Sequence, residues 1–137
     1  TNRAISITGS GTLSQISSGI ITFNGNVTGT NANLILTATS GRTGIVNGII
    51  SLGTGGVEKL DAGTWELTAA NTYSGTTTIT AGTLRTSGAA NVIPDGSEVV
   101  NNATLQLNGA DETIAGLSGT DTNATITRSV AGALTLT

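Results

Sequence analysis

The chain has 137 residues, no cysteine and a formal net charge of -3. Its length corresponds to one domain, and without cysteine it has no disulfide framework and gives no sign of its redox compartment. The five basic residues stand one by one along the chain, so they form no basic face of the kind that nucleic-acid binding needs. No apolar run is long enough to predict a membrane span.

The composition favours a narrow core. Hydrophobic residues make up 36% of the chain and aromatic residues 2%, which is little bulk for an ordinary β-sandwich. Disorder usually combines low hydrophobicity with high charge, but only 9% of these residues are charged. A stack of thin layers needs few large side chains in each layer, and a solenoid has this kind of core.

In chain order, short segments of alternating apolar and polar residues follow one another between turns rich in Gly, Asn and Ser. Alternation at period two with β-branched residues predicts strands, and no segment has a helical stripe. We expect strands at residues 4–8, 12–16, 20–23, 33–37, 64–68, 76–80, 83–86, 99–100, 104–107, 113–117, 124–127 and 133–137, with further apolar residues for the core in 44–52.

Similar segments recur at a nearly constant spacing. Their centres at Trp65, Leu84, Leu105 and Ile126 are almost evenly spaced, whereas the longer interval from Leu34 to Trp65 breaks the rhythm. A period of about 20 residues predicts a solenoid. About seven coils with a rise of about 4.8 Å each would make a rod roughly 30 Å long. An antiparallel sandwich remains the alternative, because closely spaced turn signals also fit that class.

Residues 55–86 carry a more specific pattern, GGVEKLDAGTWELTAANTYSGTTTITAGTLRT. This stretch resembles the autotransporter-associated β-strand repeat, a passenger repeat of bacterial secreted and surface proteins, and weaker similarity extends over about residues 44–119. Trp65 stands where the family usually has Leu. The matching residues are Gly55, Gly56, Lys59, Ala62, Gly63, Thr64, Leu67, Asn71, Thr72, Tyr73, Gly75, Thr77, Thr78, Ile79, Gly82, Thr83 and Leu84.

The resemblance implies an all-β fold, a single right-handed parallel β-helix spanning residues 1–137. It also implies export from a Gram-negative-type cell and a place outside the cell or on its surface, as a stalk, scaffold or adhesive rod. Because the repeat is a structural unit, the resemblance implies no catalytic residues. We also expect no cofactor and no metal.

The residues themselves give little sign of catalysis. The chain has no His to activate a Ser or Thr nucleophile. Some β-helix enzymes cleave polysaccharides with clustered carboxylates, but Asp111 and Glu112 are sequence neighbours and should point to opposite sides of a strand. We expect the carboxylates to be surface and turn residues. Those considered are Asp61, Glu66, Asp95, Glu98, Asp111, Glu112 and Asp121.

Metal and sugar binding were considered in the same way. Calcium-binding solenoids repeat Gly-Gly-x-Gly-x-Asp, but no Asp follows residues 53–56 at the required place. Trp65 and Tyr73 would suit a sugar-stacking platform. We expect instead that Trp65 packs in the core and that Tyr73 covers a corner of a coil with its hydroxyl in water.

The two ends complete the functional hypotheses. The chain is in a predicted strand by Ala4 and ends within the predicted strand 133–137, without a polar cap at either end. Uncapped solenoid ends pair with other chains. We therefore expect a non-catalytic extracellular building block that stacks head to tail with other copies of itself. An adhesin segment that binds glycans or cell surfaces is the alternative, and a polysaccharide-cleaving enzyme is a third hypothesis.

Overall fold

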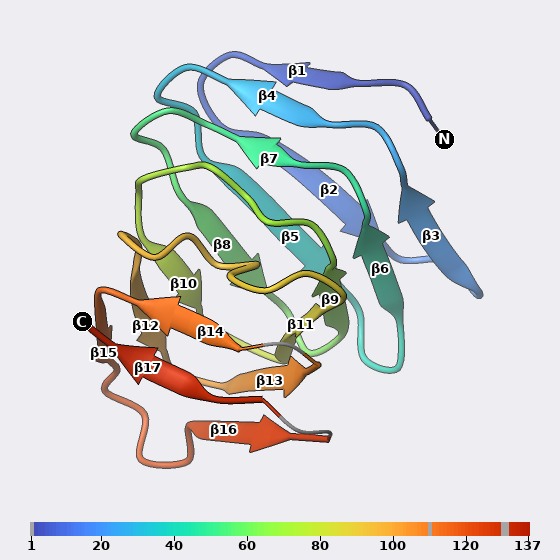
Figure 1. Ribbon diagram of the computed structural model, residues 1–137. Helices are drawn as coiled ribbons and strands as arrows, with labels where there is room; N and C mark the ends of the chain where they lie inside the picture. Colours follow the sequence, from blue (N-terminus) through green and yellow to red (C-terminus); the bar gives the residue numbers. More distant parts are fainter. Residues whose placement is uncertain (1, 110, 130–131) are drawn as a thin grey trace.

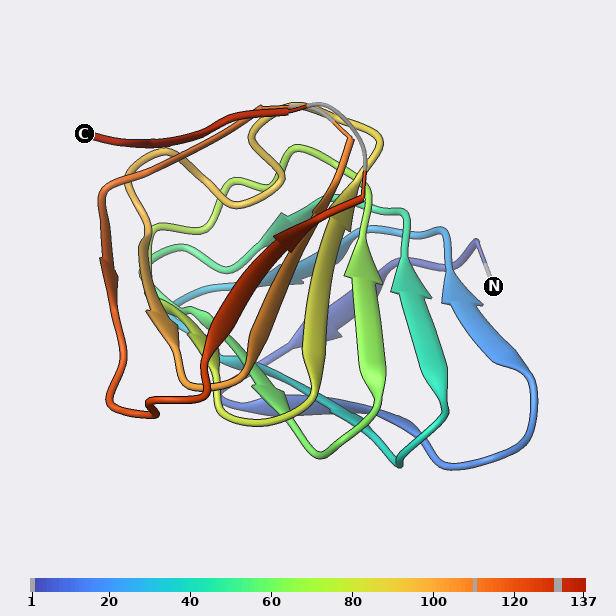
Figure 2. The same ribbon diagram turned by 90° about the horizontal axis from the view of Figure 1, so that it is seen from below.

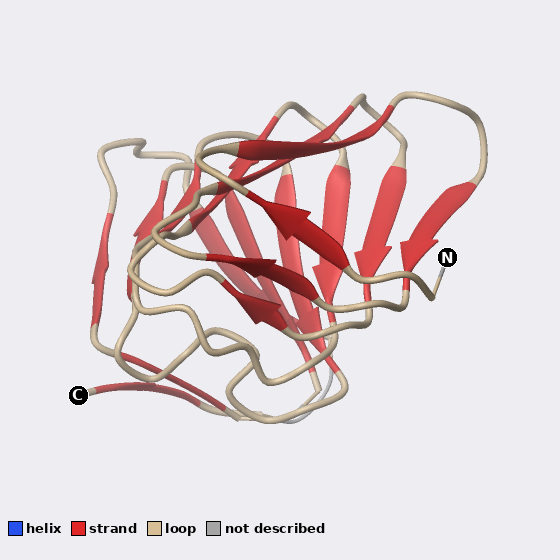
Figure 3. Cartoon of the chain, turned by 90° about the horizontal axis from the view of Figure 1, so that it is seen from above, coloured by secondary structure: helices blue, strands red, loops and turns tan. Residues whose placement is uncertain are grey.

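The computed structural model describes residues 2–109, 111–129 and 132–137, in which every regular element is a β-strand (Figure 1). Short turns connect most of the strands (Figure 3). The strands are β1 (Ile5–Ile7), β2 (Gly11–Gln15), β3 (Ile20–Phe23), β4 (Val27–Gly29), β5 (Leu34–Ala38), β6 (Thr43–Val46), β7 (Ile50–Ser51), β8 (Val57–Leu60), β9 (Thr64–Leu67), β10 (Thr77–Ile79), β11 (Thr83–Ser87), β12 (Glu98–Asn101), β13 (Thr104–Asn108), β14 (Glu112–Ile114), β15 (Gly116–Ser118), β16 (Thr125–Arg128) and β17 (Leu134–Leu136).

The strands form a β-solenoid. Sheet 1 has the order β15-β12-β10-β8-β5-β2 and sheet 2 the order β16-β13-β11-β9-β6-β3. The third face of the coil consists of β1, β4 and β7, then the loops 68–76 and 88–97, then β14 and β17. Every strand pair in the described residues is parallel, so the antiparallel alternative is wrong.

The solenoid has about six turns, close to the seven expected. Each turn passes from the third face through sheet 1 to sheet 2, and β17 begins a further turn. In Figure 2 the C-terminal turn lies nearest the viewer, and the chain runs anticlockwise as it approaches. The coil is therefore right-handed, the hand that parallel crossover connections adopt.

The register explains both the regular and the irregular spacings in the sequence. Trp65 pairs with Leu84, Leu84 with Leu105 and Leu105 with Ile126, as their spacing predicts. Leu34 lies in sheet 1 and Trp65 in sheet 2, so the long interval between them compares two different sheets. The length of a turn also varies, because the step from Val27 to its partner Ile50 is longer than the step from Glu98 to its partner Gly116.

The core is a column of aliphatic side chains inside the coil. Residues that alternate along each strand point inward, and those of the central turns are fully buried, for example Leu36, Leu67, Leu84 and Leu105. At the first turn the inward residues are only half-buried, and at the last turn Ile126 remains 39% exposed. The inward side chains of a turn are thus fully buried only where a neighbouring turn lies on both sides.

One predicted strand is wrong. Residues 113–117 form the ends of two strands, β14 and β15, separated by a bend at Ala115. The Ala115 amide donates to the carbonyl of Ser97 in the preceding turn, which holds the bend at the corner between the third face and sheet 1. The aliphatic side chains continue through this corner, so their pattern alone does not mark it.

Candidate functional site

The carboxylates considered for catalysis lie on different faces of the solenoid. Glu98 belongs to sheet 1 and Glu66 to sheet 2, whereas Asp95 lies in a loop of the third face. Glu66 accepts from the Arg85 guanidinium at 3.2 Å on the neighbouring strand, so its carboxylate serves a cross-strand ion pair. Within the described ranges no group of three or more His, Cys, Asp or Glu side chains could hold a metal ion.

The corner and end carboxylates are also separated. Asp61 has a left-handed backbone, with φ 62°, in the corner after β8. Asp121 accepts from the backbone amide of Asn123 at 2.8 Å, which closes the corner before β16. Asp111 is exposed whereas Glu112 is 1% exposed, which confirms that these neighbours point to opposite sides.

Glu112 is a buried carboxylate on the third face, so the expectation that it is a surface or turn residue is wrong. Its two oxygens accept from the backbone amides of Val92 and Ile93, each at 3.1 Å, so it holds the loop 88–97 against β14. Burial raises the pKa of Glu112 to about 7, although the amides of Val92 and Ile93 and the Thr86 hydroxyl lower it, and the nearby Asp95 raises it further.

Asn71 forms similar side-chain hydrogen bonds to the backbone on the third face, nearer the N-terminal end of the solenoid. Its side-chain oxygen accepts from the Ile50 amide at 2.8 Å, and its side-chain nitrogen donates to the Val92 carbonyl at 2.7 Å. Asn71 and Glu112 therefore join β7, the two loops and β14 by side-chain hydrogen bonds, where regular strands are missing from the third face. Buried polar groups need such partners.

Tyr73 is buried, which contradicts the expectation that its hydroxyl lies in water. The side chain is 1% exposed, and its hydroxyl lies 2.7 Å from that of Thr77, which in turn lies 3.3 Å from that of Ser97. The loop 68–76 has no strand to supply alternating inward side chains, and the large Tyr73 ring fills the core there. Burial raises the pKa of its phenol above the ordinary value.

Trp65 lies in the core, as predicted, and is fully buried. Its indole nitrogen donates to the Thr37 carbonyl at 2.9 Å, and its ring stacks on Phe23 with centroids 6.1 Å apart. Trp65 and Tyr73 therefore form no sugar-stacking platform.

Lys59 is a buried cation at the corner between sheets 1 and 2. Its side chain is fully buried, and its ammonium group donates to the carbonyls of Leu60, Asp61 and Ala81. Burial lowers the pKa of Lys59 to about 8, and the charge of Asp61 raises it in part. These contacts join two successive turns, because Ala81 lies in the corner after β10.

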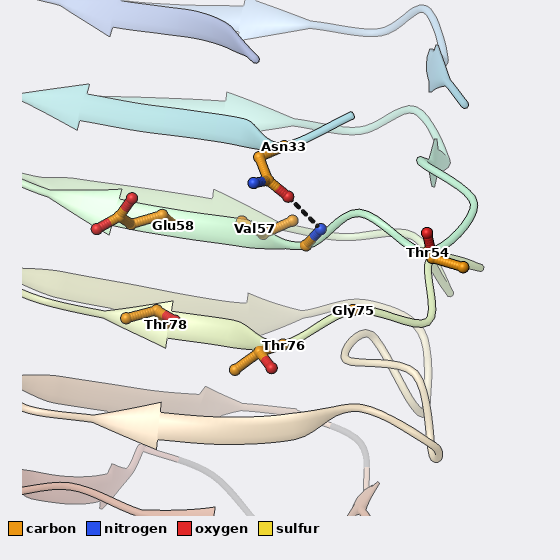
Figure 4. A pocket seen from close by; sticks show the side chains of 8 residues that line it. Asn33, Thr54, Val57, Glu58, Gly75, Thr76 and Thr78 are labelled. Carbon is orange, nitrogen blue, oxygen red and sulfur yellow. Dashed lines mark hydrogen bonds between the residues drawn. The ribbon is translucent and has the colours of Figure 1, made fainter. Parts of the chain in front are cut away.

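A polar groove opens on the outer face of sheet 1. It encloses about 290 Å³ beside the start of β8 and β10 and is lined by Asn33, Thr54, Gly56, Val57, Glu58, Gly75, Thr76 and Thr78 (Figure 4). The Asn33 side-chain oxygen accepts from the Gly56 amide at 2.9 Å and so fixes one wall. Hydroxyl groups and a single carboxylate suit contacts with hydroxyl-rich molecules.

Sequence reasoning missed the structural roles of Asn71, Lys59 and Glu112. For Asn71 and Lys59 the available signal was their place in the repeat pattern, and for Glu112 it was a charged residue at an inward position beside a predicted strand.

No helix in the part of the chain described here could cross a membrane.

The chain was compared with protein families, curated proteins and solved structures. No curated protein and no solved structure matches the chain. A family model does match: residues 57–85 fit the passenger-associated-transport-repeat. The matched residues run from the start of β8 into β11 and include Lys59, Trp65, Asn71 and Tyr73. The segment β8 to β11 is thus a passenger-type repeat, the repeat predicted at residues 55–86.

Proposed function

We propose that this β-solenoid is a non-catalytic structural unit of an extracellular or surface fibre, in which copies stack head to tail. The observation that carries the proposal is the state of the two end turns. Both leave inward apolar side chains uncovered, whereas the turns between them bury theirs completely.

An open cavity lies at the C-terminal end of the solenoid. A cavity of about 250 Å³ opens between β15 and β16, and its wall includes Leu117 and Ile126, which are 38% and 39% exposed. At the other end Ile7, Leu13, Ile21 and Phe23 are only partly buried. Another turn placed on each end would cover these side chains in the way that neighbouring turns cover one another.

The N-terminal and C-terminal parts of the solenoid carry opposite net charges. Residues 1–57 contain Arg3 and Arg42 and no acidic residue, giving a net charge of +2. Residues 58–137 contain three basic residues and all eight acidic ones, giving -5, and the two parts sum to the -3 of the chain. This asymmetry along the solenoid favours head-to-tail encounters over head-to-head ones.

The strands at both ends also have free edges. β2 and β15 are the edge strands of sheet 1, and β3 and β16 are those of sheet 2. Because all strands run parallel, β2 of a second copy can add to β15 and β3 to β16 without reversing direction. Such edges are templates for pairing with another chain.

Sedimentation and negative-stain electron microscopy over a range of concentrations test the proposal. We expect rods of uniform width whose length increases with concentration and decreases at high salt, because salt screens the opposite charges of the two parts. Ile126→Asp should abolish the assembly, since it places a charge on the surface to be covered.

The matched control for this variant is Thr127→Asp. Thr127 is the next residue on β16, and its side chain points away from the core. This variant should assemble like the parent chain. A parent chain that remains a single short rod at high concentration would refute the proposal.

The groove on sheet 1 favours a second candidate function, adhesion through glycans. The threonine hydroxyls and the Glu58 carboxylate can bond to sugar hydroxyls. Binding to a glycan array, compared between the parent chain and Thr76→Val, tests this candidate. We expect Thr76→Val to weaken binding, and an array without signal would count against it.

A further inference from the structure

The groove on the outer face of sheet 1 has a floor without side chains. Gly56 and Gly75 line it (Figure 4). A Cβ atom on Gly56 would lie 2.2 Å from the Thr76 carbonyl oxygen, and one on Gly75 would lie 2.5 Å from the backbone of Gly55. The close packing of successive turns therefore keeps this floor bare, which leaves room for a ligand between the polar side chains around it.

The threonines of the groove lie between two carboxylates on neighbouring turns. Thr78 pairs with Glu58 of the preceding turn, and Thr76 stands beside Glu98 of the following turn. The two carboxylates are thus two turns apart, about 9.6 Å along the solenoid axis. A single metal ion cannot bind both at this distance, since its oxygen ligands lie about 2–2.6 Å away. A chain molecule with several cationic groups can reach both.

No basic side chain accompanies these carboxylates on the outer face of β5, β8, β10 and β12, all of which the structure describes. The basic residue in these strands is Lys59, whose side chain is fully buried. An acidic face attracts cationic ligands and repels anionic ones. The outward residues of the four strands are Ile35, Thr37, Glu58, Leu60, Thr78, Glu98 and Val100.

From this geometry we infer that the groove binds a glycan with free amino groups, an oligomer of a non-acetylated amino sugar. The inference rests on the second candidate function, adhesion through this groove. The ammonium groups of the sugar pair with the carboxylates of Glu58 and Glu98. The sugar hydroxyls bond to the side chains of Asn33, Thr76 and Thr78.

A sugar fits this site better than a basic peptide does. Peptides that bind to a sheet add as a strand to its free edge, but β8 and β10 are each paired with a strand on both sides. The groove also offers no apolar pocket for a peptide side chain, because Val57 is 1% exposed and the other side chains that line the groove are polar.

Titration calorimetry with two matched oligomers tests the inference. The probes are the hexamer of glucosamine and the hexamer of N-acetylglucosamine, which have the same sugar backbone and differ in charge. We expect the glucosamine hexamer to bind about tenfold more tightly, and the difference to shrink at high salt because salt screens the carboxylates.

Substitutions without a change of shape identify the groups responsible. Glu58→Gln with Glu98→Gln should remove most of the preference for glucosamine and leave binding of the acetylated hexamer nearly unchanged. Glu66→Gln is the matched control, because it makes the same change of charge on sheet 2 and should keep the preference. Thr76→Val should weaken the binding of both hexamers, since it removes a hydroxyl that both can use.

The outcomes separate this inference from glycan adhesion itself. Equal binding of both hexamers, weakened by Thr76→Val, overturns the selection for amines and leaves adhesion through the groove intact. A preference that persists in the Glu58→Gln and Glu98→Gln double variant also overturns that selection. No binding of either hexamer overturns the inference, and the glycan array then decides adhesion separately. A lysine hexamer that binds as tightly as the glucosamine hexamer, with or without Thr76→Val, overturns the assignment to a sugar.

Discussion

The indole of Trp65 packs directly against Gly44 of the preceding turn. The two residues are register partners in sheet 2, and a Cβ atom on Gly44 would lie 2.6 Å from the Trp65 ring. Phe23 of the turn before that stacks on the same indole. The missing side chain at Gly44 provides the space for the large Trp65 ring.

The first prediction concerns this pair. Gly44→Ala should lower the free energy of unfolding by about 1–3 kcal/mol, because an added methyl group in a tightly packed core forces its neighbours out of place. Chemical denaturation measures the change. Gly96→Ala is the control, since nothing lies within 4 Å of its added Cβ atom, and it should change stability by less than about 0.5 kcal/mol. Equal losses in the two variants would contradict the packing described here.

The repeat and its strands could be predicted because the alternation of residues is local. Trp65, Leu84, Leu105 and Ile126 stand in the same place in successive turns, so their spacing alone gives the register of sheet 2. The contact with Gly44 was not predicted, although Gly44 stands 21 residues before Trp65, the interval that also separates Leu84 from Leu105. Glycine has no side chain, so it does not continue the apolar pattern that marks the inward positions.

The third face was less predictable for a different reason. In the loops 68–76 and 88–97 no alternation marks which side chains point inward. Asn71 is placed by hydrogen bonds to two other turns, and Tyr73 by a hydroxyl contact with Thr77 at the start of β10. No local pattern encodes these partners. In the sequence Glu112 has the features of a surface residue. It is buried because the loop 88–97 covers it.

The second prediction is the pH dependence that follows from Glu112. Its pKa is raised to about 7 in the folded chain, whereas an ordinary Glu titrates near 4.5. The folded chain therefore holds this proton more tightly than the unfolded chain, and stability should fall as pH rises from about 4.5 to about 7. The loss should be on the order of 3 kcal/mol. Denaturation at pH 5 and pH 8 measures it.

Glu112→Gln is the control for the pH effect. Glutamine has nearly the same shape, and its side-chain oxygen can still accept from one of the two loop amides, but it does not titrate. The stability of the variant should therefore vary much less between pH 5 and pH 8 than that of the parent chain. The same pH dependence in the parent chain and the variant would show that Glu112 is not its source.

The third prediction concerns Lys59. Lys59→Met keeps much of the side-chain volume but removes the donor that serves the carbonyls of Leu60, Asp61 and Ala81. Leaving buried acceptors unpaired costs about 1–3 kcal/mol each, and relief from burying a charge offsets part of this. We expect a net loss of about 2 kcal/mol at pH 7. A variant as stable as the parent would show that water replaces the lost donor.

The Lys59 pKa also gives a pH signature. Because it is lowered to about 8 from an ordinary 10.5, the unfolded chain holds this proton more tightly than the folded chain between these values. The Lys59 contribution to stability should therefore increase as pH rises from about 8 to about 10.5, and Lys59→Met should lack this increase. Denaturation of both proteins at pH 8 and pH 10.5 makes the comparison.

The last prediction concerns Arg128, the charged residue at the open end of sheet 2. Arg128 pairs with Leu107 of the preceding turn, and the same position is held by Thr86 and Leu67 in the two turns before that. The side chains of all three are buried, so Arg128 stands at an inward position, on the face that a second copy would cover. An inward charge at a sheet edge opposes pairing. Arg128→Leu should therefore lower the concentration at which rods form by about tenfold, which corresponds to about 1.4 kcal/mol. Sedimentation of Arg128→Leu beside Thr127→Leu separates this effect from added surface hydrophobicity, and equal gains in both variants would place the contact elsewhere.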